Sequence, residues 1–183
     1  MSAKSKGSAF ERLVCKQLSK WVQGKEKPYL FWRQPLSGGL ATIDELNKDL
    51  SGDIRSIAPE SEWFPFSVEC KVGYPNTTFW QHFKGIKNFN LRNFWIQCCD
   101  DARKSQRYAM LVYRKKGKQE VVGIEESVYN DLMEIQEFIN DLPAIVMRWE
   151  IDYLPSMVLL PWQRFLKAVS PEDIKTLGDI NDA

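Results

Sequence analysis

Two short segments with strand character, each carrying an acidic side chain near one end, constrain the fold of this chain most strongly. Residues 52–57 read Gly-Asp-Ile-Arg-Ser-Ile, which predicts a strand with Asp53 at its start. Residues 64–71 predict a second strand that is apolar until it reaches Glu69 and Lys71. Side chains alternate along a strand, so Glu69 and Lys71 share one face. If the two strands pair, Asp53 lies beside Glu69.

Two carboxylates with a neighbouring amine are a set of groups that suits a divalent, oxygen-binding cation and a water that must lose a proton. We expect Lys71 to orient or help deprotonate that water and to offset charge in the transition state. Burial would lower the pKa of Lys71. Cys70 points to the opposite face, which we expect to be the buried one. The alternative for Asp53 and Glu69 is a pair of exposed acids at strand ends.

Length and composition indicate an ordinary globular domain. The chain has 183 residues and 44% hydrophobic content, enough for one domain with a core. It contains no apolar run long enough to span a bilayer and no secretory signal at its start. The four cysteines lack zinc-ligand spacing, so we expect reduced, buried thiols in a cytoplasmic protein. His82 is the sole histidine, which argues against a Ser/His/Asp triad or a histidine metal site.

Hydrophobic periodicity predicts an α/β layered domain with a mixed sheet. The pattern favours helices over residues 7–21, 79–88, 91–104 and 125–140 and another that begins near 170. It favours strands over residues 29–33, 52–57, 64–71, 108–114, 120–124 and 144–151, of which the fourth and fifth form a hairpin. We expect one domain over residues 1–183, with a core at about 4–124 and an extension at about 125–183 packed on it.

Charge is unevenly placed although the formal net charge is only +1. Residues 1–35 and 84–118 are strongly basic, whereas residues 125–141 are acidic. Two basic segments in a nearly neutral chain suggest one positive face, as a nucleic-acid binder needs. The alternative is solvated lysines on amphipathic helices.

Several motifs together resemble a known group of nucleases. Asp53 followed sixteen positions later by Glu69-Cys70-Lys71 resembles the PD-(D/E)xK nuclease signature. Residues 6–12, Lys-Gly-Ser-Ala-Phe-Glu-Arg, are similar to the first-helix motif of archaeal-type and phage Holliday junction resolvases in that superfamily. The Ser37-Gly38-Gly39 loop resembles their serine-bearing loop, and residues 95–112 resemble their glutamine helix and following strand. The resemblance covers roughly residues 4–115, and Gly52 replaces the proline of the signature.

This resemblance implies a restriction-endonuclease-like core and a divalent-metal-dependent DNA endonuclease, acting as a homodimer on Holliday junctions or other branched DNA. It implies Mg²⁺, with Mn²⁺ as a substitute, and the cytoplasm of a bacterial or archaeal cell or a phage-infected host. The implied catalytic residues are Glu11, Asp53, Glu69, Lys71 and Gln97. The implied metal ligands are Asp53, Glu69, the backbone carbonyl of Cys70, and Glu11. The expected DNA contacts are Lys4, Lys6, Arg33 and Ser37.

Alternatives remain open at this point. The substrate could instead be duplex ends, single strands or a recognition sequence, or the chain could be an inactive DNA-binding module of the same fold. Gln97 could hold Lys71 or the attacking water, or be a surface residue. Ser37 could be a turn former, and the tryptophans could stack on bases or pack in the core. The apolar segment 157–162 could supply an interface or close the core.

Overall fold

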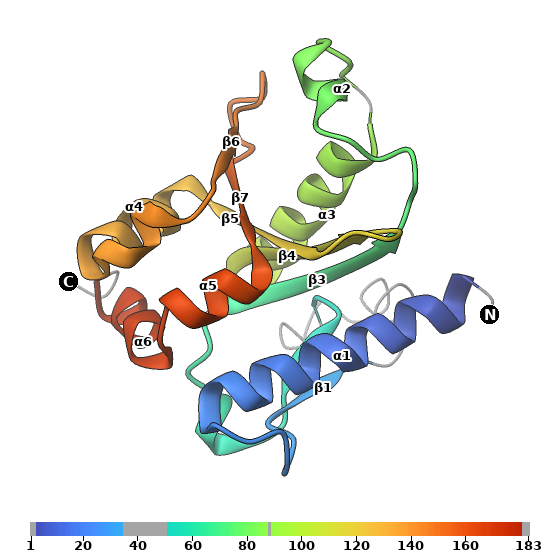
Figure 1. Cartoon of the computed structure of the whole chain (residues 1–183). Coiled ribbons are helices and arrows are strands. Elements are labelled where there is room, and N and C mark those ends of the chain that lie inside the picture. Colours follow the sequence, from blue (N-terminus) through green and yellow to red (C-terminus); the bar gives the residue numbers. More distant parts are fainter. Residues whose placement is uncertain (1–2, 35–50, 88, 181–183) are drawn as a thin grey trace.

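A computed structural model describes residues 3–34, 51–87 and 89–180 of the chain (Figure 1). Its centre is a mixed seven-stranded sheet in the order β1-β2-β3-β4-β5-β7-β6. Strands β3 and β4 run parallel, and the other neighbours in the sheet are antiparallel. The predicted α/β class with a mixed sheet is therefore confirmed. The strands are β1 (Phe31–Arg33), β2 (Ile54–Ser56), β3 (Phe66–Gly73), β4 (Tyr108–Lys115), β5 (Glu120–Glu125), β6 (Ile145–Met147) and β7 (Met157–Pro161).

Helices cover both faces of this sheet. The α-helices are α1 (Ala3–Gln23), α2 (Trp80–Phe83), α3 (Asn90–Ser105), α4 (Glu126–Ile135), α5 (Trp162–Ala168) and α6 (Pro171–Ile180), and short 3-10 turns span Pro59–Ser61 and Glu137–Asp141. Helix α1 lies on one side of β3 and α3 on the other (Figure 1). Because each face of the central strands meets a helix, both faces are buried.

Helix α1 forms because its apolar side chains recur at helical spacing. Phe10, Val14 and Leu18 make one buried stripe that packs on Val68 and Cys70 of β3. On the other face, Trp95 and Cys98 of α3 belong to a second cluster with Leu111 of β4. The expectation of a single buried face for β3 is therefore wrong, because α3 also covers the face that carries Glu69.

The C-terminal part differs most from the sequence predictions. Strand β7 was not predicted, yet it lies between β5 and β6 in the sheet. The predicted helix over 125–140 ends at Ile135, where Gln136 adopts extended backbone before a 3-10 turn. The predicted strand over 144–151 is limited to Ile145–Met147.

Two indole hydrogen bonds tie this C-terminal part to α1. The Nε1 atom of Trp162 donates to Gln17 Oε1 at 2.8 Å, and that of Trp21 donates to the carbonyl of Val169 at 2.9 Å. Trp162 is fully buried, so the apolar segment 157–162 helps to close the core. Helix α1, which carries part of the candidate site, is thus held by residues far along the chain.

The remaining predictions about composition can be placed on this fold. All four cysteines are free and buried, as predicted. Among the tryptophans, Trp95 is fully buried, whereas Trp80 is 61% exposed on α2. Of the helices in the described ranges, none has the length and apolar character to cross a membrane.

Candidate active site

The first acid of the site is held by the backbone of the neighbouring strand. Ile54 of β2 pairs with Val68 of β3, and this antiparallel register sets Asp53 beside Glu69, as predicted. The Asp53 amide donates to the Val68 carbonyl at 2.8 Å, and the Cys70 amide donates to Asp53 Oδ2 at 2.8 Å. Asp53 is therefore fixed by two main-chain hydrogen bonds, one of which is accepted by its carboxylate.

Gly52 permits this close approach. Its φ of +82° lies in the left-handed region that favours glycine. A Cβ atom at this position would lie 2.9 Å from Ser67 Oγ and 3.0 Å from the Val68 carbonyl oxygen. Proline cannot adopt this φ, so the departure from the signature noted above has a backbone cause.

The second acid is buried rather than exposed. Glu69 is 2% exposed and Asp53 is 8% exposed, so the alternative of two exposed strand-end acids is wrong. Glu69 Oε1 is in ion-pair contact with the Lys71 ammonium, but among the described residues no donor reaches it in hydrogen-bond geometry. Burial and the neighbouring charge of Asp53 raise the pKa of Glu69 to about 7, against the lowering influence of Lys71.

Lys71 is a cation in this arrangement. Its Nζ atom donates to Gln97 Oε1 at 3.0 Å and lies 5.4 Å from the ring centroid of Phe94. Burial alone would lower the pKa of Lys71, but the charge and contact of Glu69 outweigh it, and the pKa is raised. A charged ammonium suits contact with phosphate better than removal of a proton from water. Gln97, although exposed, is tied to Lys71 rather than standing alone on the helix surface.

A cavity of about 560 Å³ opens beside these groups, between α1 and the end of β3. Glu11, Asp53, Lys71 and the predicted DNA contact Lys6 line it, and Glu69 and Gln97 adjoin it through Lys71. We call it the site cavity. It brings together an acid from the first helix and the acid and lysine from the strands.

Glu11 is engaged by a second predicted residue. Arg33 Nε donates to Glu11 Oε2 at 2.9 Å, so the expected DNA contact and the expected metal ligand form one ion pair. Their side chains are 30% and 15% exposed, which makes the pair half-buried. The predicted contact Ser37 and the side chain of Lys4 lie outside the described residues.

Comparison of the sequence with models of known protein families identifies the family of this chain. A family model described as "Phage putative PDDEXK endonuclease" matches residues 2–176. The chain belongs to this family. Searches of curated proteins and of solved structures found no match. The match extends well past residue 115, where the resemblance read from the sequence ended.

Membership confirms the PD-(D/E)xK resemblance and makes the protein a hydrolytic endonuclease. The mixed sheet with helices on both faces is consistent with the restriction-endonuclease-like core of that superfamily. The finer resemblance to Holliday junction resolvases stays a prediction.

PD-(D/E)xK nucleases generally use divalent metals, so the residues of this endonuclease can be tested for their fit to one. Within the described ranges, no group of three or more His, Cys, Asp or Glu side chains is placed to hold a metal ion. Magnesium, however, is often held by one or two carboxylates and keeps water and phosphate oxygens as its other ligands. The buried, donor-poor Glu69 carboxylate beside Asp53 fits a cation of that kind. Burial raises the pKa of the Cys70 thiol well above its usual range, so only its backbone carbonyl is a plausible ligand.

The sequence reasoning missed two residues at this endonuclease site. Lys116, from the turn after β4, lines the site cavity. Tyr74 also lines it and packs edge-to-face on Phe94, with ring centroids 4.8 Å apart. The basic turn at 115–118 was a signal for Lys116, but only tertiary structure brings it beside α1.

Proposed function

We propose that this endonuclease cuts DNA with the help of a divalent cation bound between Asp53 and Glu69. The observation that carries the proposal is the burial of two adjacent carboxylates against one ammonium. Two ionised carboxylates buried next to each other repel, and their burial destabilises the fold. Buried ionisable groups with strongly shifted pKa values cluster at functional sites, and a bound cation would offset the repulsion between the two carboxylates.

The cation we propose is Mg²⁺, with Mn²⁺ as a substitute. Its protein ligands would be Asp53, Glu69 and the backbone carbonyl of Cys70, joined by Glu11 when Arg33 releases it. When bound, such a metal activates water and stabilises charge on the phosphate and on the leaving oxygen. The protein would supply the ordered carboxylates on which this chemistry depends.

Lys71 would act as a fixed positive charge toward the scissile phosphate. Gln97 holds the ammonium on one side and Glu69 on the other, which limits its reorientation during the reaction. Groups that are already oriented toward developing charge stabilise a transition state without further rearrangement. We therefore assign Lys71 to electrostatic stabilisation and Gln97 to positioning.

The DNA backbone would pass over the site cavity and contact basic side chains around it. Lys6 and Lys116 line the cavity, and we add Lys4, Arg33 and Ser37 as proposed phosphate contacts. Phosphate contacts of this kind position DNA and make binding sensitive to salt.

For the substrate we propose branched DNA, Holliday junctions above all, cut by a homodimer in a DNA recombination or repair step. The proposal rests on the likeness of residues 6–12 and 37–39 to motifs of junction resolvases. Two symmetric cuts need two sites, which a twofold dimer supplies. Cleavage would take place in the cytoplasm of the cell that holds the DNA. Duplex ends, single strands and a recognition sequence are the competing substrates.

A cleavage assay tests these proposals together. Four-way junction, linear duplex, flap and single-strand substrates are incubated with Mg²⁺, Mn²⁺ or chelator. The wild-type protein should cut the junction with either metal and nothing with chelator. Cleavage of linear duplex in preference to junctions would remove the resolvase proposal but keep the metal site.

Variants locate the site in the same assay. Asp53→Asn keeps the size of the side chain but removes its charge, and we expect no detectable cleavage. Glu62→Gln makes the same chemical change at an exposed position near β3 and should cut like the wild type. Unchanged activity in Asp53→Asn would show that the site is placed wrongly.

A further inference from the structure

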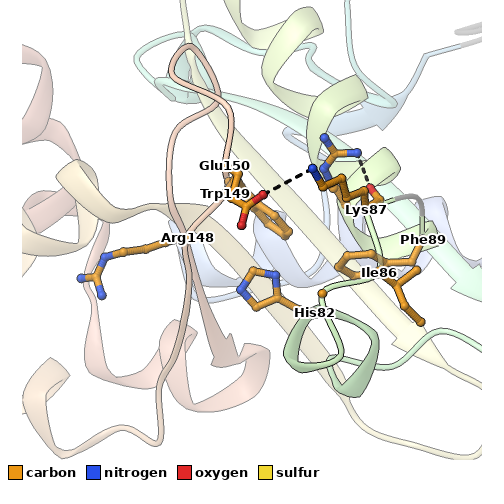
Figure 2. Close-up of a pocket in the computed structure, with 9 residues that line it drawn as sticks. His82, Ile86, Lys87, Phe89, Arg148, Trp149 and Glu150 are labelled. Atoms are coloured by element: carbon orange, nitrogen blue, oxygen red, sulfur yellow. Dashed lines mark hydrogen bonds and ion pairs between the residues drawn. The ribbon is translucent and has the colours of Figure 1, made fainter.

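A second cavity lies away from the site cavity, between the segment after α2 and the segment after β6 (Figure 2). Its volume is about 300 Å³, at the lower end of small-molecule sites. It shares no lining residue with the site cavity among the described residues. The lining side chains that matter are His82, Lys87, Phe89, Arg92, Trp149 and Glu150.

Three rings form one wall of this second cavity. His82 meets Trp149 edge-to-face with centroids 5.1 Å apart, and Phe89 lies 6.2 Å from Trp149. The indole Nε1 of Trp149 is buried, and no acceptor reaches it in the described structure. A buried donor without a partner is unfavourable, so a ligand that brings an acceptor atom to this N–H would be favoured.

Lys87 and Arg92 place positive charge at the rim of the second cavity. Lys87 pairs with Glu150 at 3.7 Å (Figure 2), but both side chains are more than 80% exposed, at 83% and 89%. Exposed pairs of this kind contribute little, so Lys87 can exchange Glu150 for another anion at small cost. Arg92 donates to the carbonyl of Lys87, which keeps its guanidinium at the rim. Arg148 belongs elsewhere: it points away in Figure 2 and pairs with Glu126.

We propose that the second cavity binds a single nucleotide. A flat heteroaromatic base matches the ring wall and offers the acceptor atom that the Trp149 N–H lacks. A phosphate matches Lys87 and Arg92. Neither a purely apolar ligand nor a simple anion would use both features.

The position of the cavity indicates where such a nucleotide comes from. Arg92 and Gln97 lie on the same helix, α3, five residues apart, or about 8 Å along its axis. Gln97 holds Lys71 of the candidate active site. Helix α3 thus contributes a residue to each site, and we propose an unpaired nucleotide of the bound DNA as the source. This source rests on the proposed function, whereas binding of a free nucleotide does not.

The first experiment measures binding without cleavage. The Asp53→Asn protein in chelator is titrated with dTMP, thymidine and inorganic phosphate, and binding is followed by calorimetry. We expect dTMP to bind at least tenfold more tightly than either fragment. Trp149→Phe keeps a ring but removes the N–H, and Arg92→Gln removes the charge; each should weaken dTMP binding about five- to tenfold. Glu150→Gln should tighten it.

Matched controls separate the site from general effects. Trp80→Phe changes an exposed tryptophan of α2, and Lys104→Gln changes an exposed cation of α3. Both should leave dTMP binding unchanged, and circular dichroism should show that all variants are folded. Absence of dTMP binding, or equal binding by the Trp149 and Arg92 variants, overturns the proposal.

The second experiment identifies the source of the nucleotide. Asp53→Asn protein is mixed with blunt duplex and with duplex that carries a one-base overhang. A preference for the overhang that disappears in Trp149→Phe supports an unpaired nucleotide of the DNA. Binding of dTMP without any overhang preference keeps the site but overturns that source. Because neither assay needs metal or catalysis, failure here is distinct from failure of the proposed nuclease function.

Discussion

The two faces of strand β3 are both buried, yet they are built from opposite chemistry. The face toward α1 carries Phe66, Val68 and Cys70 within a continuous apolar cluster. The face toward α3 carries Glu69, and Lys71 follows it at the strand end. The same eight-residue strand thus buries apolar side chains toward α1 and an acid toward α3, and the site cavity opens at its end beside α1.

This difference shows that burial has two uses in one strand. Burying apolar area stabilises the fold, roughly in proportion to the area removed from water. Burying carboxylates costs stability, and the raised pKa of Glu69 is a sign of that cost. The free energy gained by burying the apolar face therefore offsets the cost of burying the acid on the other face. Substitutions on the two faces should separate effects on stability from effects on activity.

The largest effect is expected on the apolar face. Phe66→Ala removes a fully buried ring that contacts Phe64 and Tyr108. We expect the free energy of unfolding to fall by about 3–5 kcal/mol, measured by urea denaturation. Phe66→Leu, which leaves a smaller cavity, should lose less and keep the wild-type cleavage rate per folded molecule. A large loss of cleavage in folded Phe66→Leu would contradict the separation of the two faces.

On the polar face, Lys71→Met should reduce cleavage and leave the free energy of unfolding nearly unchanged. It keeps the aliphatic stem but removes the charge that faces phosphate in the proposed mechanism. We expect kcat to fall about 10²–10³-fold, the usual loss when one preorganised electrostatic group is removed. Single-turnover cleavage and urea unfolding of the same preparation check both quantities. A kcat within threefold of wild type would exclude a direct role.

The pH dependence of stability should report the cost of burying Glu69. Its native pKa of about 7 is above the ordinary 4.5, so the native state holds the proton more tightly. The carboxyl imposes no penalty below pH 4.5, and stability is lost as pH rises through 7. In chelator, wild type should therefore lose on the order of 2–3 kcal/mol relative to Glu69→Gln between pH 4.5 and pH 8.

Added Mg²⁺ sharpens that test. If Glu69 is a metal ligand, millimolar Mg²⁺ at pH 8 should increase the free energy of unfolding of the wild-type protein but not that of Glu69→Gln. Parallel stability curves for the two proteins in chelator would mean that Glu69 does not carry this penalty.

The smallest effect is expected at Gln97. Gln97→Leu removes one hydrogen bond to the Lys71 ammonium, which is worth about 1–2 kcal/mol. We expect about a tenfold loss of kcat with little change in stability. Lys104→Ala, also on α3 but in an exposed ion pair, is the control and should be neutral. Equal kcat values for Gln97→Leu and the control would remove the positioning role.

The sequence was sufficient to predict features that depend on local pattern. The pairing that sets Asp53 beside Glu69 follows from two short strands, and the register confirms it. The apolar stripe of α1 follows from helical spacing. Both are predictable because neighbouring residues in the chain already determine the signal.

Features that depend on distant contacts were not predictable in the same way. Strand β7 is a short apolar run buried between two other strands, and such a run lacks the alternation that marks a half-buried strand. The Glu11–Arg33 pair joins residues 22 positions apart. The raised pKa of Lys71 depends on Glu69 outweighing burial, a balance that requires coordinates.

The backbone at Gly52 has a consequence for how relatives of this nuclease are recognised. A search pattern that demands proline before the acid would reject this chain, because the two residues need φ values of opposite sign. A larger side chain would also meet Ser67 and the Val68 carbonyl. A pattern that accepts either proline or glycine would retrieve both backbone solutions. The first position of the signature therefore reflects the local backbone conformation. The acidic residues and the lysine that follow it supply the chemical groups.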